Sequence, residues 1–241
     1  MLPTLLVEPT PEQLVLTAAE MLVEAARADI LARGVFTFAL SGGSTPRALY
    51  QTLADRKWRA QIDWKRTHVF FGDERAVPSN DEYSNYRMAR EALLGHVPIP
   101  EENVHRMKGE SADLEAAAIE YETGLRANFP LDVVLLGMGE DGHTASLFPH
   151  SPALHETEKL CVATPVASLE PHLPRLTITF PAINAARRVW LISTGEGKAA
   201  RLKEVFDGLQ NGASDVESTP ISGVQPHGEY LWLLDKTAAC N

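Results

Sequence analysis

Short apolar runs alternate with stretches of helical periodicity along the whole chain. The apolar runs predict strands at residues 5–7, 35–40, 67–71, 132–136, 176–180, 189–193 and 231–234. Apolar residues recurring at helical spacing predict helices at residues 10–34, 48–55, 85–94, 111–128 and 198–209. This alternation predicts an α/β fold, in which a mostly parallel central sheet carries helices on both faces.

No repeat, low-complexity run or convincing linker divides the chain. Its 241 residues can bury one sizeable core. We therefore expect residues 1–241 to form a single domain, with an exposed loop at residues 211–218.

The chain is acidic, with 22 Lys and Arg against 32 Asp and Glu and a formal net charge of −10. This charge disfavours general attraction to nucleic acid or to an anionic membrane. An anionic small substrate would need local cations, which draws attention to Arg and Lys residues near glycine-rich loops.

Several features predict a cytoplasmic protein. No stretch approaches the ~20 apolar residues of a membrane span, and the N-terminus lacks the basic region of a signal peptide. The two cysteines, Cys161 and Cys240, are too few for a disulfide framework. Cys240 is expected to be a free thiol on a loose tail.

A segment rich in glycine and hydroxyl side chains follows the second predicted strand. It consists of Ser41, Gly42, Gly43, Ser44, Thr45 and Pro46. Glycines let backbone N–H groups approach an anion, hydroxyls add donors, and a helix N-terminus supplies positive potential. In the plain alternative, Thr45 caps a helix that has Pro46 at its first position. Two glycines followed by two hydroxyls exceed what capping needs, which favours phosphate binding.

Three charged residues, Asp73, Glu74 and Arg75, follow the third predicted strand. They could form a solvated turn. Arg75 is, however, a good planar donor for a phosphate or a carboxylate. Asp73 or Glu74 could orient Arg75 or contact sugar hydroxyls.

Residues 137–149 follow the predicted central strand and carry Glu140, Asp141 and His143 through a glycine-rich turn. Open α/β folds bind ligands at such strand ends. Residues 137–142 formally match the dinucleotide pattern G-x-G-x-x-G, but charged groups fill the turn and no strand clearly leads to an acid for the ribose. Histidine ordinarily titrates near neutral pH, so His143 is interpreted as a catalytic base rather than a helix cap.

Two further basic residues are candidate anion ligands. Lys198 ends a turn at residues 195–198 that resembles half of a P-loop, but Ile192 and Ala199 occupy positions where a P-loop needs other residues. This disfavours ATP hydrolysis and leaves Lys198 as a point charge for phosphate. Arg175 is a lesser candidate, for which a structural role is equally open. The histidines are scattered and no ligand-spacing pattern supports them, so no required metal is predicted.

Four segments together resemble the 6-phosphogluconolactonase family. They are LSGGSTP (40–46), FGDERAVP with SNYR (71–78 and 84–87), LLGMGEDGHTASLFP (135–149) and STGEGK (193–198). The family is related in fold to glucosamine-6-phosphate deaminases and ribose-5-phosphate isomerases, and implies a Rossmann-like three-layer fold. It also implies hydrolysis of 6-phospho-D-glucono-1,5-lactone to 6-phosphogluconate, the second step of the oxidative pentose phosphate pathway, without a cofactor.

For that reaction His143 is expected to act as the base that activates water and later as the acid. Asp141 would orient the imidazole or stabilise its charged form, although Glu140 remains open for this part. The expected phosphate and substrate ligands are Ser41, Gly42, Gly43, Ser44, Thr45, Asp73, Arg75, Lys198 and Arg175.

Two other functions remain open. An isomerase or deaminase acting on an amino-sugar phosphate would use the same loop, but its second motif reads more like DEY. Here Arg75 follows the two acids and SLFP follows the histidine, which favours the lactonase. A non-catalytic sugar-phosphate sensor is the other alternative. The expected partner is a small sugar-phosphate lactone, with no nucleic acid or membrane, and the chain is expected to be a monomer or homodimer.

Overall fold

The structure, a computed structural model, describes residues 1–166 and 170–239. The predicted free thiol of Cys240 lies outside the described residues. None of the helices in the described part of the chain is both long enough and apolar enough to cross a membrane.

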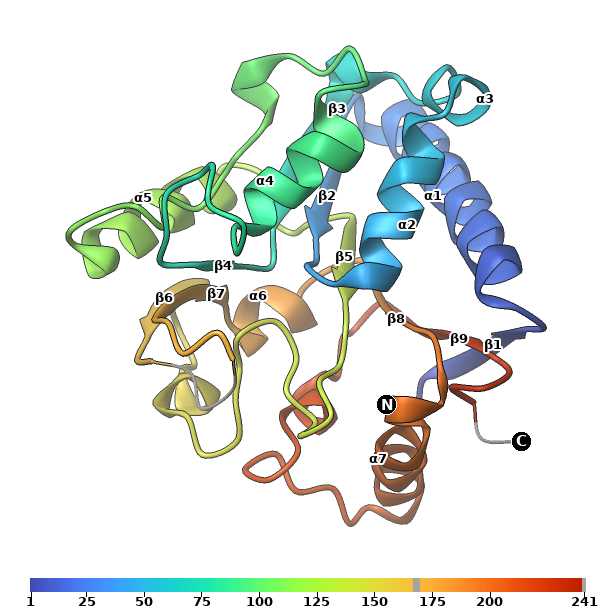
Figure 1. The fold of residues 1–241 in the computed structure, drawn as a ribbon, viewed down its shortest axis with the longest axis vertical. Helices are drawn as coiled ribbons and strands as arrows, with labels where there is room; N and C mark the ends of the chain where they lie inside the picture. The colour runs from blue at the N-terminus through green and yellow to red at the C-terminus, as the bar shows by residue number, and fades with distance from the viewer. Residues whose placement is uncertain (167–169, 240–241) are drawn as a thin grey trace.

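A six-stranded sheet forms the centre of the fold (Figure 1), and all of its strand pairs are parallel. In spatial order the strands are β1 (Thr4–Glu8), β9 (Glu229–Asp235), β8 (Arg188–Ser193), β5 (Val133–Leu136), β2 (Phe36–Leu40) and β3 (Thr67–Phe71). The chain runs from β2 outward to β3, and from β5 outward to β8. The strand order therefore reverses between the neighbouring strands β2 and β5, so the switch point of the sheet lies between these two strands.

Helices cover both faces of this sheet, as predicted. They are α1 (Pro11–Arg33), α2 (Ser44–Ala54), α3 (Arg56–Arg59), α4 (Asn85–Ala89), α5 (Leu114–Arg126), α6 (Phe180–Asn184) and α7 (Ala199–Asn211). Residues of α1 to α4 share one hydrophobic cluster with Phe38 and Leu40 of β2, whereas α5 to α7 share the other with Ala39. Because successive side chains of a strand point to opposite faces, the buried strands are apolar throughout.

A second sheet was missed from the sequence. Strands β4 (Asp73–Arg75), β7 (Arg175–Ile178) and β6 (Cys161–Thr164) form an antiparallel sheet in that order. The strand predicted at residues 176–180 belongs to this sheet and not to the parallel one. Residues 73–75 form a strand although none of them favours one, because pairing with β7 overrides local preference.

The helix boundaries agree with the predictions at some ends and differ at others. Thr10 caps α1 by accepting from the backbone N–H of Gln13, and Gly34 ends that helix with a φ of 81°. The helix predicted to start at residue 48 begins at Ser44, so the alternative in which Thr45 is its cap is wrong. The helix predicted at residues 85–94 is α4 followed by a π-helical turn. The short helical turns are Trp64–Arg66, Arg90–Leu94, Glu101–Asn103, Pro152–His155, Glu196–Lys198 and Pro220–Gly223.

Asp132, just before β5, joins three elements at the amino end of the sheet. It is buried, and its carboxylate pairs with Arg33 of α1 and lies 3.2 Å from Nε of Arg187. It also accepts from the backbone N–H of Thr37 in β2 at 2.9 Å, while Thr37 Oγ1 accepts from the N–H of Asp132 at 2.8 Å. This network fixes the register of β5 against β2.

We expect Asp132→Ala to lower the free energy of unfolding by about 2 kcal/mol, measured by urea denaturation. The substitution leaves the N–H of Thr37 and two guanidinium groups without their acceptor. The expected loss of unfolding free energy is smaller than for a fully buried ion pair because Arg33 and Arg187 are 33% and 43% exposed. The control is Glu120→Ala, which removes an exposed pair with Lys108 and should cost ~0.5 kcal/mol or less. Equal losses in both variants would contradict the role of Asp132.

Candidate functional site

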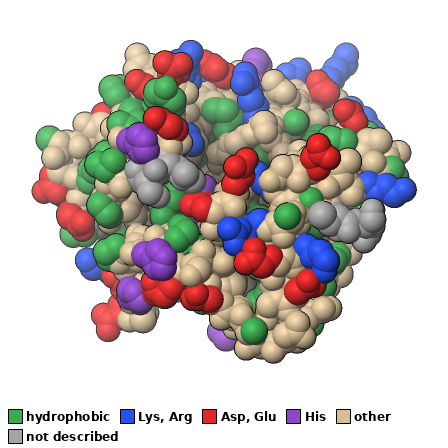
Figure 2. Space-filling view, turned by 60° about the horizontal axis from the view of Figure 1, so that its bottom comes forward, with side chains coloured by type: hydrophobic (Ala, Val, Ile, Leu, Met, Phe, Trp, Pro, Cys, Tyr) green, Lys and Arg blue, Asp and Glu red, His purple; other side chains and the backbone are tan. Residues whose placement is uncertain are grey.

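A cavity of about 240 Å³ opens where the carboxyl ends of β2 and β5 meet the second sheet. This is the switch point, where ligands of open α/β folds bind. On the face shown in Figure 2, Lys and Arg side chains are scattered among Asp and Glu. The cavity is lined by Ser41, Gly42, Gly43, Asp73, Arg75, Gly137, Met138, Gly139, His143, Ala145, Phe148, Glu170, Arg175 and Lys198.

The glycine and hydroxyl segment forms one wall of the cavity. Gly43 has a φ of 105°, a conformation that favours glycine, and lets the chain turn from β2 directly into α2. Helix α2 therefore points its N-terminus, with backbone N–H groups that have no partner within the helix, toward the cavity loop. No side chain in the described part of the chain caps this end. The arrangement suits an anion.

Two buried tyrosines hold the ends of the neighbouring strands β2 and β3. The hydroxyl of Tyr50 in α2 accepts from the backbone N–H of Ser41 and donates to its carbonyl, both at 2.8 Å. Tyr121 of α5 does the same at Phe71, at 2.8 and 2.7 Å. Burial raises the pKa of both phenols, so each stays protonated and can donate. These hydrogen bonds thus fix the backbone at the strand ends from which the loops lining the cavity begin.

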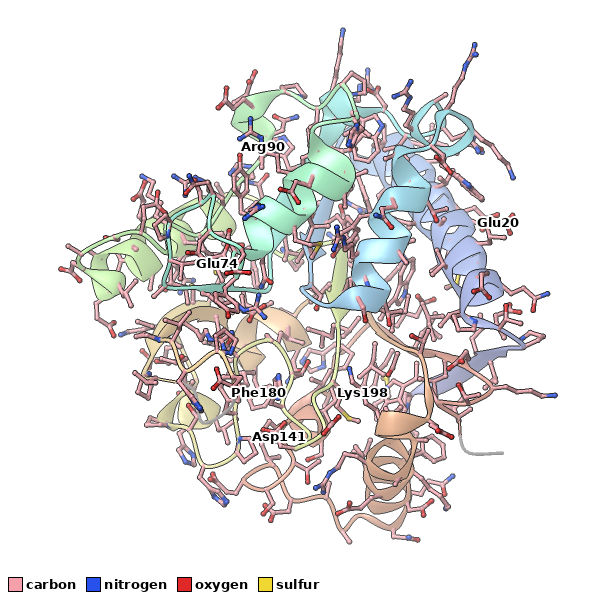
Figure 3. The ribbon with its side chains drawn as sticks, in the orientation of Figure 1. Glu20, Glu74, Arg90, Asp141, Phe180 and Lys198 are labelled. Atoms are coloured by element: carbon pink, nitrogen blue, oxygen red, sulfur yellow. The ribbon has the colours of Figure 1, made fainter. Side chains whose placement is uncertain are left out.

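Strand β4 supplies Asp73 and Arg75 to the cavity. Side chains two residues apart in a strand share a face, so Glu74 points the other way and lies beside the start of α4, where Figure 3 labels it. Its buried carboxylate accepts from the backbone N–H groups of Arg75, Asn85 and Tyr86 and from Ser84 Oγ, at 2.7 to 2.9 Å. Glu74 therefore anchors β4 to α4.

The turn after β5 places His143 at the cavity through its glycines. A Cβ on Gly139 would lie 2.1 Å from Nδ1 of His143, so only glycine leaves room for the imidazole. Gly142 has a φ of 84°, and its Cβ would lie 2.7 Å from Cγ2 of Thr219. The backbone N–H of Gly139 donates to the carbonyl of His143 at 2.9 Å and closes the turn. Residues 143–151, directly after the G-x-G-x-x-G match, form turns and not a helix, in agreement with rejection of the dinucleotide interpretation.

Asp141 holds the imidazole. Its Oδ1 lies 2.5 Å from Nδ1 of His143 and accepts from the backbone N–H of His143 at 3.1 Å. Burial alone would raise the pKa of Asp141, but the bonds from His143 outweigh it and lower this pKa below its ordinary value. The ionised carboxylate assigns the proton to Nδ1 and leaves Nε2 as an acceptor. Glu140 is exposed and makes no such bond.

Lys198 lies half-buried at the cavity, on the turn before α7 (Figure 3). Burial lowers its pKa, and the negative charge of Glu140 partly offsets this effect. The turn is tied down by Asp235, whose Oδ1 accepts from the N–H of Gly195 at 3.0 Å. It is also tied to the glycine loop, because the hydroxyls of Thr194 and Thr45 lie 2.8 Å apart.

Arg175 of β7 is almost fully buried, yet it lines the cavity. It donates to the carbonyls of Leu173 and Pro171 at 3.3 and 2.9 Å, and its guanidinium lies 5.8 Å from the ring centroid of Phe148. Burial lowers the pKa of Arg175, while the charge of Asp73 raises it. The side chain combines a structural role with a cationic face toward the cavity.

The structure brings most of the predicted site residues together. Those that line the cavity are Ser41, Gly42, Gly43, Asp73, Arg75, His143, Arg175 and Lys198. Ser44, Thr45 and Asp141 do not line it: Ser44 is exposed on α2, Thr45 bonds Thr194, and Asp141 bonds His143. Sequence reasoning assigned no role to Asn85, Ser146 and the two tyrosines. For Asn85 the only signal was its place in the motif SNYR.

Comparisons with known proteins identify the family to which the sequence is similar. A family model described as glucosamine-6-phosphate isomerases/6-phosphogluconolactonase matches residues 9–232. The 6-phosphogluconolactonase of Synechocystis sp. is 43% identical over 220 residues, which cover 88% of this chain and 87% of that protein. The 6-phosphogluconolactonase of Mycobacterium tuberculosis is 41% identical over 242 residues, covering 96% and 95%.

Solved structures show the same fold. The 6-phosphogluconolactonase from Trypanosoma cruzi matches with a TM-score of 0.86 and 30% identity, over 99% of this chain and 96% of that one. A monomeric glucosamine-6-phosphate deaminase matches with a TM-score of 0.83 over 98% and 99%, but at 21% identity this likeness concerns the fold alone. The expected Rossmann-like three-layer architecture is confirmed.

We expect Gly139→Ala to break the hydrogen bond between Asp141 and His143, because the new Cβ would clash with Nδ1 of His143 at 2.1 Å. The measurement is proton NMR, in which the imidazole proton of this short bond should appear far downfield in the wild type and vanish in the variant. Gly124→Ala in α5 is the control, since its Cβ would meet nothing closer than 4.0 Å. Survival of the downfield signal in Gly139→Ala would refute this account of the turn.

Proposed function

The chain belongs to the family of glucosamine-6-phosphate isomerases and 6-phosphogluconolactonases, and we propose that it hydrolyses 6-phospho-D-glucono-1,5-lactone to 6-phosphogluconate in the oxidative pentose phosphate pathway. Three relatives that bear the lactonase name are 41 to 43% identical over most of the chain. The observation that carries the proposal is that an imidazole with its own carboxylate, two arginines and a lysine meet at one cavity.

His143 supplies the proton chemistry in this proposal. Its Nε2 accepts a proton from water as the water oxygen attacks the lactone carbonyl carbon. The tetrahedral intermediate then collapses, the bond from C1 to the ring oxygen breaks, and the imidazolium returns its proton to that oxygen. Asp141 keeps the ring oriented and stabilises the transient positive charge through Nδ1. The step needs no covalent intermediate and no cofactor.

The phosphate of the substrate occupies the other end of the cavity. The glycine loop and the N-terminus of α2 offer backbone donors, Lys198 adds a point charge, and Arg75 has a buried Nε without a partner in the described residues. Asp73 and Arg175 contact the sugar in this assignment. Holding the phosphate positions the lactone carbon for attack, so binding energy remote from the reacting bond contributes to the rate.

At the level of the whole chain, we propose a single-domain cytoplasmic enzyme over residues 1–241, acting as a monomer or homodimer. Its chemistry is assigned to side chains and not to a metal. The proton transfers are assigned to His143 and Asp141, whose side chains share a hydrogen bond.

A coupled assay tests the activity against its alternatives. The purified protein is given freshly generated phosphogluconolactone or glucosamine-6-phosphate, and the spontaneous hydrolysis of the lactone is subtracted. Lactone turnover well above the spontaneous rate supports the proposal. Turnover of the amino sugar alone would instead indicate a deaminase, and turnover of neither would indicate a sensor.

We expect His143→Ala to lower kcat on the lactone by ~10²–10⁴, the usual contribution of a general acid–base group. The control is His96→Ala, because His96 is exposed and is not among the residues that line the cavity. Near-normal kcat in a folded His143→Ala enzyme would remove His143 from the catalytic role.

We expect the affinity for 6-phosphogluconate to weaken as pH rises through the lowered pKa of Lys198, before the ordinary lysine value of 10.5 is reached. The affinity weakens with rising pH because deprotonation removes the positive charge of the Lys198 ammonium group. Titration calorimetry at several alkaline pH values measures it. Lys198→Arg should make the affinity nearly independent of pH, because guanidinium stays protonated. Glu140→Gln should move the weakening to lower pH, since Glu140 raises the pKa of Lys198. An unchanged pH dependence in Lys198→Arg would assign it to another group.

A further inference from the structure

Asn85, the first residue of α4, bonds both charged residues that β4 presents to the cavity. It is 3% exposed. Its Oδ1 accepts from Nη1 of Arg75 at 2.7 Å, and its Nδ2 donates to Oδ1 and to the backbone carbonyl of Asp73, both at 2.9 Å. One uncharged amide therefore presents its acceptor to a cation and its donor to an anion.

The position of this amide is itself held from two sides. The backbone N–H of Asn85 donates to the buried carboxylate of Glu74 at 2.7 Å. On the other side Asn85 lies against the glycine loop, because a Cβ on Gly42 would lie 2.3 Å from Asn85 Oδ1. Asn85, at the start of α4, thus contacts both β4 and the glycine loop that forms one wall of the cavity.

Asp73 and Arg75 would be natural partners for each other without this amide. They share a face of β4 at a spacing of two residues and carry opposite charges. Nevertheless, none of the ion pairs among the described residues includes Arg75 or Asp73. The acceptors of Arg75 Nη1 are the Tyr83 carbonyl and Asn85 Oδ1, both uncharged, and its buried Nε has no partner among residues 1–166 and 170–239.

Asp73 is held in the same way by neutral donors. Its Oδ1 accepts from Asn85 and its Oδ2 accepts from Ser146 Oγ at 2.7 Å. The hydrogen-bond partners of both groups are neutral, so these bonds fix Arg75 and Asp73 without neutralising them. Arg75 therefore keeps a charge for a ligand in the cavity, while the charge of Asp73 also acts on Arg175. A carboxylate in place of the amide would cancel the charge of Arg75.

We propose that Asn85 is a positioning residue that keeps Arg75 and Asp73 apart and presents the unpaired charge of Arg75 to the sugar phosphate. This inference rests on the proposed function, because it concerns the substrate of that site. Asn85 acts through Arg75 and Asp73 and takes no part in the proton transfer.

The first test is Asn85→Leu, which keeps the size of the side chain and removes both hydrogen-bonding groups. Arg75 and Asp73 should then pair, and KM for the lactone should rise by about tenfold or more with a smaller change in kcat. Asn103→Leu is the matched control, because Asn103 is also buried and donates to two backbone carbonyls, those of Lys65 and Thr67, away from the cavity. It should lower the melting temperature without changing KM.

A double-mutant cycle separates positioning from simple packing. In an Asp73→Asn background Arg75 has no carboxylate to pair with, so the added effect of Asn85→Leu on KM should shrink by at least about threefold. A merely structural role would give the same factor in both backgrounds. That result, or an unchanged KM in Asn85→Leu, would overturn the proposal.

Asn85→Asp tests the same idea if the leucine variant does not fold. Its carboxylate would neutralise Arg75 and lie beside Asp73, so KM should rise at neutral pH, and the ratio of variant to wild-type KM should fall as the pH is lowered and the new acid is protonated. A ratio near one, or one that does not depend on pH, would overturn the proposal. A wild-type enzyme that does not exceed spontaneous lactone hydrolysis would overturn the proposed function as well, whereas failure of the variants alone overturns only the role of Asn85.

Discussion

The site depends on one residue, Gly72, which lies between β3 and β4 and hydrogen-bonds to one strand of each sheet. Its backbone N–H donates to the carbonyl of Leu40 in β2 at 2.8 Å, and its carbonyl accepts from the N–H of Ile178 in β7 at 2.8 Å. The chain therefore leaves the parallel sheet and enters the antiparallel one within a single residue. Since backbone groups buried at such a junction must be paired, the position of β4 relative to β2 is determined by hydrogen bonds rather than by loose loop packing.

The alternation of side chains along β4 follows from that junction. Asp73 and Arg75 point to the cavity, while Glu74 points to α4 and anchors it. The two tyrosines complete the frame, because each one satisfies both backbone groups of a residue at a strand end, Ser41 in one case and Phe71 in the other. The cavity walls thus rest on buried hydrogen bonds made behind them, and the lining residues remain free to meet a ligand.

Much of the parallel sheet could be predicted, because strands β2, β3, β5 and β8 are short apolar runs bounded by polar turns. The second sheet could not, since the strand Asp73–Arg75 consists of three charged residues, and only its pairing with β7 makes it a strand. Among the site residues, His143 and Lys198 stand in glycine-rich turns that draw attention in the sequence. Asn85 does not, because its contacts to Arg75 and Gly42 join positions that are 10 and 43 residues away in the chain (85 − 75 and 85 − 42).

The arrangement also explains how a chain of net charge −10 can bind a phosphate. Among the described residues, the hydrogen-bond partners of the two arginines at the cavity are uncharged: Arg75 bonds a carbonyl and an amide, and Arg175 bonds two carbonyls. The nearby carboxylates, Asp73 for Arg175 and Glu140 for Lys198, offset part of the positive charge. Elsewhere in the fold arginines pair with carboxylates, as Arg33 does with Asp29 and Asp132. A partly enclosed cavity screens charge less than water does, so a few unpaired cations can outweigh the distant acidic surface. Local pairing, and not net charge, therefore decides which anions the cavity accepts.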